Sequence, residues 1–145
     1  MENTIKVTLA NGAHLPSYMT EGSAGADLYA HLPEAVTLPR GTYIAIPTGV
    51  SVELPIGFEG QIRPRSGLAR KHGVTVLNAP GTIDSDYRGE IVVLLINHGT
   101  ESYIVQNGDR IAQLVICPVT HAHFRIEESL SVTQRDKQGF GHTGK

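Results

Sequence analysis

The sequence predicts an all-β fold of the sandwich or jelly-roll barrel type. Sixteen Gly and eight Pro divide the chain into short segments that are rich in β-branched residues. No apolar stripe of helical period continues for more than a turn or two. Many short strands separated by closely spaced turns are typical of sandwiches and barrels. At 145 residues, the chain fits one domain that can bury a core without disulfides.

The amino-terminal strands are predicted from alternation and from turn residues. Residues 5–9 alternate apolar and polar side chains, as a half-buried strand does, and Asn11-Gly12 ends that strand. Pro64 lacks a backbone donor, so the sheet is expected to end before it. The strands expected in this half cover residues 5–9, 26–30, 36–38, 43–46, 50–54 and 60–63.

The carboxy-terminal half begins with the one predicted helical turn, residues 66–71, with Ser66 as its N-cap. Strands are expected at residues 74–77, 90–97, 103–105, 110–118 and 123–126. The first two are predicted to pair around the loop between them, and the next two across Asn107-Gly108, a type I′ hairpin signal. The run 91–96 is apolar throughout, so we expect both of its sides to be covered, one of them by another subunit.

Charge and cysteine content limit the class of protein. A net charge of -2 argues against general binding to nucleic acid or to membranes. The single cysteine, Cys117, lies in an apolar run and is expected to be a buried thiol in a reducing compartment. The amino-terminal residues show no signal-peptide pattern, and no span is long enough to cross a bilayer. We therefore expect a cytoplasmic protein.

The strongest candidate for chemistry is the loop 78–90, with the sequence NAPGTIDSDYRGE. It carries three carboxylates, Asp84, Asp86 and Glu90, together with Tyr87, between a Pro-Gly turn and an apolar strand. Loops on a rigid β scaffold often present catalytic groups. An ordinary hairpin, whose Asp and Tyr side chains satisfy turn geometry, fits the same residues.

Three other polar features suggest a phosphate and metal site. Arg63, Arg65 and Ser66-Gly67 surround a helix start, which suits phosphate oxygens but also fits a capped turn with surface arginines. Asp27 interrupts an apolar segment and fits either a turn-stabilising carboxylate or a ligand of hydrated Mg²⁺. Gln113 interrupts an apolar strand, so its amide either finds buried partners or meets a ligand.

The tail predicts a two-part organisation: a β domain at residues 1–128 and a mobile arm at residues 129–145. From Ser129 onward apolar residues nearly vanish, which is typical of a solvated tail. Arg135 and Phe140 fit a second interpretation, in which the arm folds over a ligand. The arginine would pair with phosphate and the ring would stack on a flat heterocycle.

Five segments occur in order along the chain: residues 24–30 (AGADLYA), 63–69 (RPRSGLA), 81–90 (GTIDSDYRGE), 107–115 (NGDRIAQLV) and 140–144 (FGHTG). With these segments at these spacings, the chain resembles the trimeric dUTP pyrophosphatase (dUTPase) family over essentially its full length. The resemblance implies a jelly-roll subunit of the β-clip type and a homotrimer. Each of the three active sites would be built from all three chains, the third lending its carboxy-terminal arm.

The resemblance also implies an activity, that of a dUTP diphosphatase. Water would attack the α-phosphorus of dUTP, with Mg²⁺ as cofactor, and release dUMP and pyrophosphate. This reaction keeps uracil out of DNA and supplies dUMP for thymidylate synthesis. A dCTP deaminase of the same fold and a non-catalytic trimeric nucleotide-binding β module are the alternatives. The residues Asp84-Ser85-Asp86-Tyr87 and the full arm fit the pyrophosphatase better than the deaminase.

Individual roles follow from the same resemblance. Asp84 is implied as the general base, Tyr87 as the ring that leaves no room for a 2′-hydroxyl, and Asn78 as a reader of the uracil edge. Asp27 is implied to orient Mg²⁺ through water. The remaining implied substrate-binding residues are Thr82, Ile83 and Val92 for uracil, Arg65, Ser66, Gly67 and Gln113 for phosphates, and Arg135, Phe140 and Gly141 in the arm. Asp86 and Glu90 are expected to be structural.

The arm departs from the family pattern mainly at two positions, with a smaller difference at His142, where serine is frequent. Asp136 and Gln138 stand where glycines are usual, although the spacing from Arg135 to Phe140 is retained. This affects the expected flexibility of the arm. A carboxylate at Asp136 would also mildly repel a triphosphate unless Lys137 offsets it.

Overall fold

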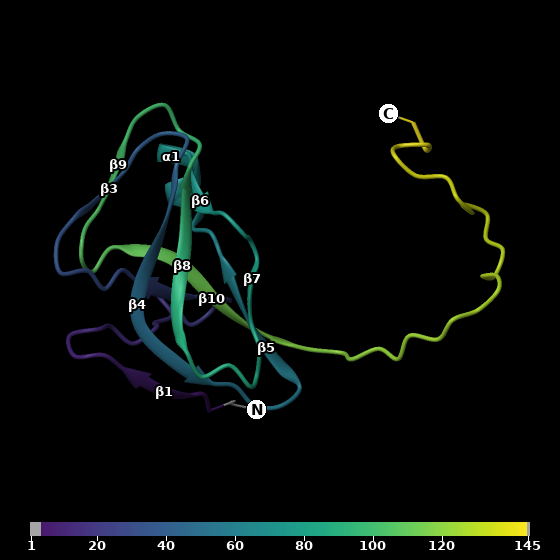
Figure 1. Cartoon of the computed structure of the whole chain (residues 1–145), viewed down its shortest axis with the longest axis horizontal. Helices are drawn as coiled ribbons and strands as arrows, with labels where there is room; N and C mark the ends of the chain where they lie inside the picture. The colour runs from purple at the N-terminus through teal and green to yellow at the C-terminus, as the bar shows by residue number, and fades with distance from the viewer. Residues whose placement is uncertain (1–3, 145) are drawn as a thin grey trace.

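Ten strands and one short helix form the computed structural model, which describes residues 4–144 (Figure 1). The elements are β1 (Lys6–Leu9), β2 (Ala26–Tyr29), β3 (Val36–Leu38), β4 (Tyr43–Glu53), β5 (Phe58–Arg63), α1 (Ser66–His72), β6 (Val74–Val76), β7 (Gly81–Ile83), β8 (Glu90–Asn97), β9 (Tyr103–Val105) and β10 (Arg110–Pro118). The predicted all-β fold class is confirmed. Among the described residues, no helix is long and apolar enough to span a membrane.

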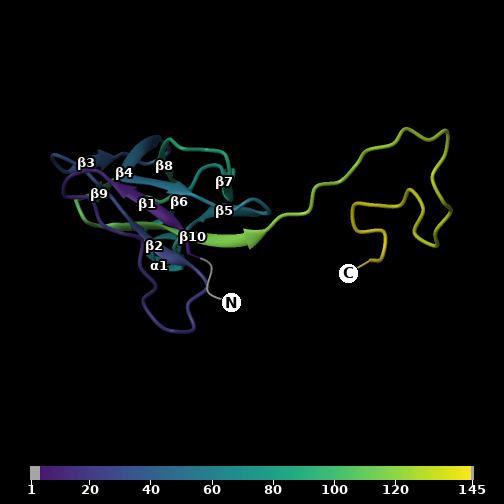
Figure 2. The same ribbon diagram turned by 90° about the horizontal axis from the view of Figure 1, so that it is seen from below.

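Two four-stranded antiparallel sheets pack face to face. One has the strand order β1-β4-β8-β6, the other β2-β10-β5-β7, and β3 pairs with β9 as a separate ribbon. Seen edge-on, β4 and β8 lie on one side of the molecule and β2 and β10 on the other (Figure 2). The apolar core fills the space between the sheets. Its largest fully buried side chains include Leu28, Leu38, Ile46, Ile91, Leu95 and Ile111.

Within this chain, one side of strand β8 is fully buried and the other is partly exposed. Ile91, Val93 and Leu95 are fully buried in the core, whereas Val92 on the other face is 43% exposed. Residues 91–96 are therefore not buried on both sides of the sheet by this chain alone. Coverage of the outer face by another subunit stays a prediction.

Strand β4 joins the two strands predicted at 43–46 and 50–54 into one. Its pairing with β8 shifts register between Pro47 and Ser51, because Pro47 cannot donate to the ladder and the residues after it bulge. Gly49 has a positive φ of 68°, and a Cβ at this position would lie 2.6 Å from the Cβ of Ala13. The bulge therefore requires glycine.

The predicted β9–β10 hairpin is wrong. Strand β9 pairs with β3, and β10 pairs with β2 and β5. A type I′ turn needs positive φ at both central residues. Only Gly108 has it, at 83°, and the backbone amide of Asp109 donates to the carbonyl of Gln106. This geometry fits a type II turn. The predicted pairing of residues 74–77 with 90–97 is confirmed as β6 with β8.

Helix α1 covers the predicted residues, but its N-cap differs from the prediction. Arg65 is the N-cap residue, in an extended conformation and with no side-chain capping bond, so the prediction of Ser66 as the cap is wrong. Ser66 already belongs to the first helical turn. Arg70, Lys71 and His72 occupy the last turn, where the helix dipole favours positive charge.

The chain leaves the sandwich after β10. The amide of Val119 donates to the carbonyl of Gly57, and residues 120–144 are exposed throughout. Figure 1 shows this segment extending away from both sheets. The strand predicted at 123–126 is not formed, because no neighbouring strand of this chain reaches it; Phe124 and Ile126 are 99% and 100% exposed. The predicted division at residue 128 stays a prediction.

Candidate functional site

Residues of the loop 78–90, which includes β7, and of strands β5 and β8 line an open cavity of about 240 Å³. Its lining includes six of the predicted substrate-binding residues: Asn78, Thr82, Ile83, Asp84, Tyr87 and Val92. The sequence did not predict β7, which adds to the edge of β5 by pairing Gly81 with Ile62 and Thr82 with Gln61. This pairing fixes one wall of the cavity. Amide, carboxylate and apolar groups converge there, as in pockets that orient a small heterocycle.

Tyr87 forms a second wall of the cavity and is held from two sides. Its hydroxyl donates to the carbonyl oxygen of Glu90 at 2.8 Å, and its backbone amide donates to the carbonyl of Asp84 at 3.1 Å. Its ring lies so close to Gly89 that a Cβ there would be 2.5 Å from the Tyr87 Cζ. Only glycine fits under this ring.

The three carboxylates of the loop differ in their surroundings. Asp84 lines the cavity, and its carboxylate has no hydrogen-bond or ion-pair partner among residues 4–144. Asp86 is exposed, as Asp84 and Glu90 are, but it lies outside the cavity lining. Glu90 lines the cavity, but its Oε1 accepts the backbone N–H of Gly49 at 2.7 Å. Asp84 and Glu90 therefore both line the cavity, and of these two only Glu90 has a hydrogen-bond partner among residues 4–144.

A second polar group forms around Asp27, whose side chain is only 3% exposed. Its Oδ1 lies 3.5 Å from Nε of Arg65, and its Oδ2 lies 3.2 Å from Nη1 of Arg110. Gln113, its register partner on β10, places Nε2 at 3.5 Å from Oδ1. Three residues predicted for phosphate and metal binding therefore meet in one place. We call Asp27, Arg65, Arg110 and Gln113 the Asp27 cluster.

Arg110 is the member of this cluster that the sequence interpretation missed. Besides its ion pair with Asp27, its carbonyl oxygen accepts a hydrogen bond from Nη1 of Arg65 at 3.1 Å. Its position at the start of an apolar strand that also contains Gln113 was the available signal. Two guanidinium groups around one carboxylate leave a net charge of about +1, which suits phosphate oxygens.

Arg63 lies outside the cluster. Its Nε and Nη2 donate to Oε1 of Gln61 at 3.0 and 2.6 Å. Ser66 and Gly67 are exposed directly after Arg65, at the start of α1. The phosphate-binding surface predicted from this segment is thus represented by Arg65, Ser66 and Gly67.

The carboxylates of the described residues suit a metal ion that is held jointly by the protein and a substrate, rather than one held by protein ligands alone. No group of three or more His, Cys, Asp or Glu side chains lies close enough together in residues 4–144 to hold an ion. Mg²⁺ is commonly held by one or two carboxylates together with substrate phosphates, and it keeps several of its waters. Asp27, a single buried carboxylate beside side chains predicted to bind phosphate, fits this arrangement.

The two polar groups do not meet within one chain. No member of the Asp27 cluster lines the cavity, although the cavity reaches Ile62 on β5, the strand that pairs with β10. Arg135, Phe140 and Gly141 lie in the exposed extension, apart from both groups. A single chain therefore presents three separate parts of the predicted site.

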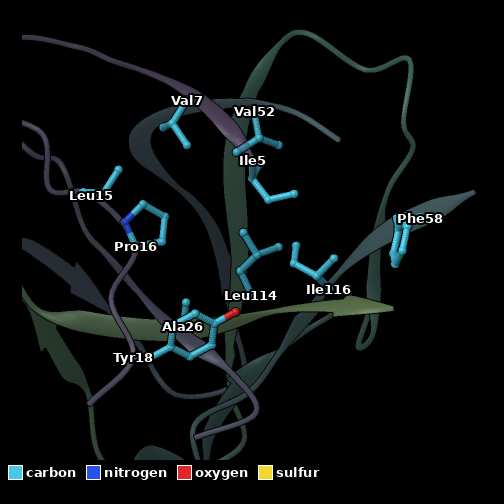
Figure 3. A pocket seen from close by; sticks show the side chains of 10 residues that line it. All are labelled: Ile5, Val7, Leu15, Pro16, Tyr18, Ala26, Val52, Phe58, Leu114 and Ile116. Carbon is cyan, nitrogen blue, oxygen red and sulfur yellow. The ribbon is translucent and has the colours of Figure 1, made fainter. Parts of the chain in front are cut away.

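A larger cavity of about 450 Å³ has a different character (Figure 3). The hydroxyl of Tyr18 is the one polar side-chain group in its lining. The lining consists of Ile5, Val7, Leu15, Pro16, Tyr18, Ala26, Val52, Phe58, Leu114 and Ile116. Such walls do not suit a triphosphate.

Comparisons with known proteins agree with these features. The dUTPase family matches residues 11–144. A deoxyuridine 5'-triphosphate nucleotidohydrolase from Chlamydia caviae is 50% identical over 145 residues, covering 98% of this chain and 99% of that protein.

Two solved structures from staphylococcal phages share the fold. The phage 80alpha dUTPase with dUPNHPP has a TM-score of 0.88 and 27% identity, covering 99% of this chain and 100% of that one. A variant of the dUTPase from phage phi11 of S. aureus, whose structure describes the coordination of a structural Mg(II) ion, has a TM-score of 0.79 and 25% identity. That match covers 88% of this chain and 98% of the phage chain. On the extent of the family match and the near full-length identity, this chain belongs to the dUTPase family.

Proposed function

We propose that this protein is a dUTP diphosphatase, which hydrolyses dUTP to dUMP and pyrophosphate. The observation that carries the proposal is the cavity in which Asn78, Asp84 and Tyr87 come together. Family membership and the activity named for the Chlamydia relative support the same reaction. In the cell, this reaction keeps uracil out of DNA and supplies dUMP for thymidylate synthesis.

Asp84 acts as the general base. It accepts a proton from the water that attacks the α-phosphorus, in line with the departing pyrophosphate. This role is supported by the position of the Asp84 carboxylate, which lines the cavity and has no partner among the described residues. The Glu90 carboxylate, by contrast, is bonded to Gly49. A positioned base of this kind contributes roughly 10²–10⁴-fold in rate.

The cavity selects the base and the sugar. Asn78 and main-chain groups of Thr82, Ile83 and Val92 hydrogen-bond the uracil edge, and the narrow walls exclude the methyl group of thymine. Cytosine is rejected because its donors and acceptors are reversed. The Tyr87 ring packs on deoxyribose and occupies the space that a 2′-hydroxyl needs. Support for this sugar gate comes from the contacts of Tyr87 with Gly89 and Glu90.

Arg65, Ser66, Gly67 and Gln113 bind the phosphates. The ion pair with Asp27 orients the Arg65 guanidinium, and Arg110 adds a second positive charge. Asp27 also orients Mg²⁺ through water; the bound ion would neutralise charge on the phosphate oxygens. The structural Mg(II) ion of the phage phi11 relative supports a metal in this family.

The active protein is a homotrimer whose sites each combine three chains. Support comes from the fact that no member of the Asp27 cluster lines the cavity within one chain, and from the exposure of Val92 on the outer face of β8. Trimer formation would cover that face.

Residues 1–128 form the β domain, and residues 129–145 form an arm that closes over a site of a neighbouring subunit. In that arm, Arg135 pairs with the γ-phosphate, and Phe140 with Gly141 covers uracil. Asp136 and Phe140 have positive φ values of 47° and 50°, a region that glycine adopts more readily. Asp136, where the family usually has glycine, thus keeps a glycine-like backbone conformation.

The protein acts in the cytoplasm, without nucleic-acid or membrane partners. The net charge of -2 supports the expected lack of nucleic-acid partners.

An assay of pyrophosphate release tests the proposed reaction. Purified protein is given dUTP, UTP, dCTP and dTTP with Mg²⁺, and again with EDTA. We expect pyrophosphate and dUMP from dUTP, far less from the other nucleotides, and loss of turnover with EDTA. Ammonia release from dCTP would indicate a deaminase instead, and dUTP binding without turnover would indicate a binding module.

A further inference from the structure

Glu90 is the one carboxylate of the cavity that is bonded to a different strand. Its Oε1 accepts the backbone N–H of Gly49 at 2.7 Å, across the boundary between β8 and β4. Gly49 lies in the bulge where the β4–β8 register shifts between Pro47 and Ser51. The side chain of Glu90 therefore takes the place of a ladder bond that the bulge interrupts.

A second side-chain bond holds the same segment. The buried hydroxyl of Thr48 donates to the carbonyl of Ile91 at 2.6 Å. Glu90 and Ile91 are the first two residues of β8. The bulge thus fixes the start of β8 through one bond to the Glu90 side chain and one to the Ile91 backbone.

The start of β8 is also the anchor of Tyr87. The phenol hydroxyl donates to the carbonyl oxygen of Glu90 at 2.8 Å, and the ring lies against Gly89. Two hydrogen bonds therefore meet at Glu90: its carboxylate accepts from the Gly49 N–H, and its backbone carbonyl accepts from the Tyr87 hydroxyl. Loss of the bond between the Glu90 carboxylate and the Gly49 N–H would make the Glu90 backbone more mobile. The Glu90 carbonyl, which accepts the hydrogen bond from the Tyr87 hydroxyl, could then move.

We infer that Glu90 is a positioning residue for sugar selection: its carboxylate, bonded to Gly49, holds Tyr87 in the orientation that excludes a 2′-hydroxyl. This inference rests on the proposed role of Tyr87. It assigns Glu90 neither substrate contact nor proton transfer.

The test measures the ratio of kcat/KM for dUTP to kcat/KM for UTP. Glu90→Ala removes the acceptor, and Glu90→Gln keeps a side-chain oxygen within reach of Gly49. Residues within one hydrogen-bond network couple by roughly 2- to 100-fold, so we expect Glu90→Ala to lower the ratio about tenfold. Glu90→Gln should stay within about twofold of wild type, because the acceptor remains.

Glu53→Ala is the matched control. Glu53 is an exposed glutamate on β4 of the same sheet, and its side chain bonds only Lys6 among the described residues. It should leave the ratio unchanged, since exposed ion pairs contribute little. A general loosening of the fold would lower turnover of dUTP and UTP alike and leave the ratio where it was.

A double-mutant cycle with Tyr87→Phe shows whether Glu90 acts through the phenol hydroxyl. In the Tyr87→Phe background, Glu90→Ala should change the ratio by less than about twofold, because the bond that it supports is already gone. If Glu90→Ala does not fold, Glu90→Asp replaces it. Its side chain is one methylene too short for the bond to Gly49, and it should lower the ratio in the same direction.

Each contrary outcome has a distinct meaning. A Glu90→Ala ratio within twofold of wild type overturns the inference, and so does a Glu90→Gln ratio as low as that of Glu90→Ala. An equal effect of Glu90→Ala with and without the Tyr87 hydroxyl overturns it too. If Tyr87→Ala itself leaves the ratio unchanged, the proposed role of Tyr87 in sugar selection is wrong, and so is the inference about Glu90. If Tyr87→Ala lowers the ratio while Glu90→Ala does not, only the role assigned to Glu90 is wrong.

Discussion

Replacement of Asp27 by Asn should destabilise the protein by about 2–3 kcal/mol, because it removes the one negative charge between two guanidinium groups. Hydrogen bonds to charged groups contribute about 1.5–3 kcal/mol each. The contacts of Asp27 with Arg110 and Arg65, at 3.2 and 3.5 Å, are at the long end of that class. The Arg110 side chain is 42% exposed, so solvent reduces its share to about 1 kcal/mol or less. The Arg65 side chain is only 24% exposed, so its ion pair with Asp27 supplies most of the remaining stabilisation.

The assay is urea unfolding at one fixed protein concentration, because assembly makes apparent stability depend on concentration. Arg110→Ala is the matched control: it leaves Asp27 paired with Arg65 and should cost about 1 kcal/mol or less. The reasoning would be refuted if Asp27→Asn stayed within about 0.5 kcal/mol of wild type. It would also fail if Arg110→Ala cost as much as Asp27→Asn.

Three further predictions concern activity. Asp84→Asn should lower kcat for dUTP by roughly 10²–10⁴-fold in a pyrophosphate-release assay, and a change of only a few-fold would remove Asp84 as the base. Tyr87→Ala should raise kcat/KM for UTP relative to dUTP; unchanged selectivity would count against the steric gate. Deletion of residues 133–145 should abolish efficient turnover while sedimentation still shows the assembled oligomer, and full activity of the truncated protein would exclude a closing arm.

The strands were largely predictable from sequence, whereas their partners were not. The bounds of β8 and β10 match the predicted ranges 90–97 and 110–118, since both are long β-branched runs between turn residues. The partner of β9 is β3, which lies more than sixty residues earlier in the chain. No local sequence pattern predicts the pairing of β3 with β9. The Asn107-Gly108 turn suggested a nearer partner, β10, that the fold does not use.

The candidate site divides in the same way. Asn78, Asp84 and Tyr87 come from one loop, so a local motif was enough to group them around one cavity. Arg110 and the bond from Glu90 to Gly49 depend on sheet order and on a bulge. Such contacts arise only when distant strands meet, and for that reason sequence reasoning left Arg110 out and gave Glu90 only a general structural role.

The most direct test of the central claim, a site shared between chains, mixes two variants. Asp84→Asn and Arg65→Ala each damage a different part of the site, and each alone should be nearly inactive. If one chain supplies Asp84 and its neighbour supplies Arg65, random mixed trimers contain intact sites in about a quarter of positions. We therefore expect the equimolar mixture, refolded together, to recover roughly a quarter of wild-type turnover of dUTP. Turnover no greater than the average of the two separate variants would contradict the shared site.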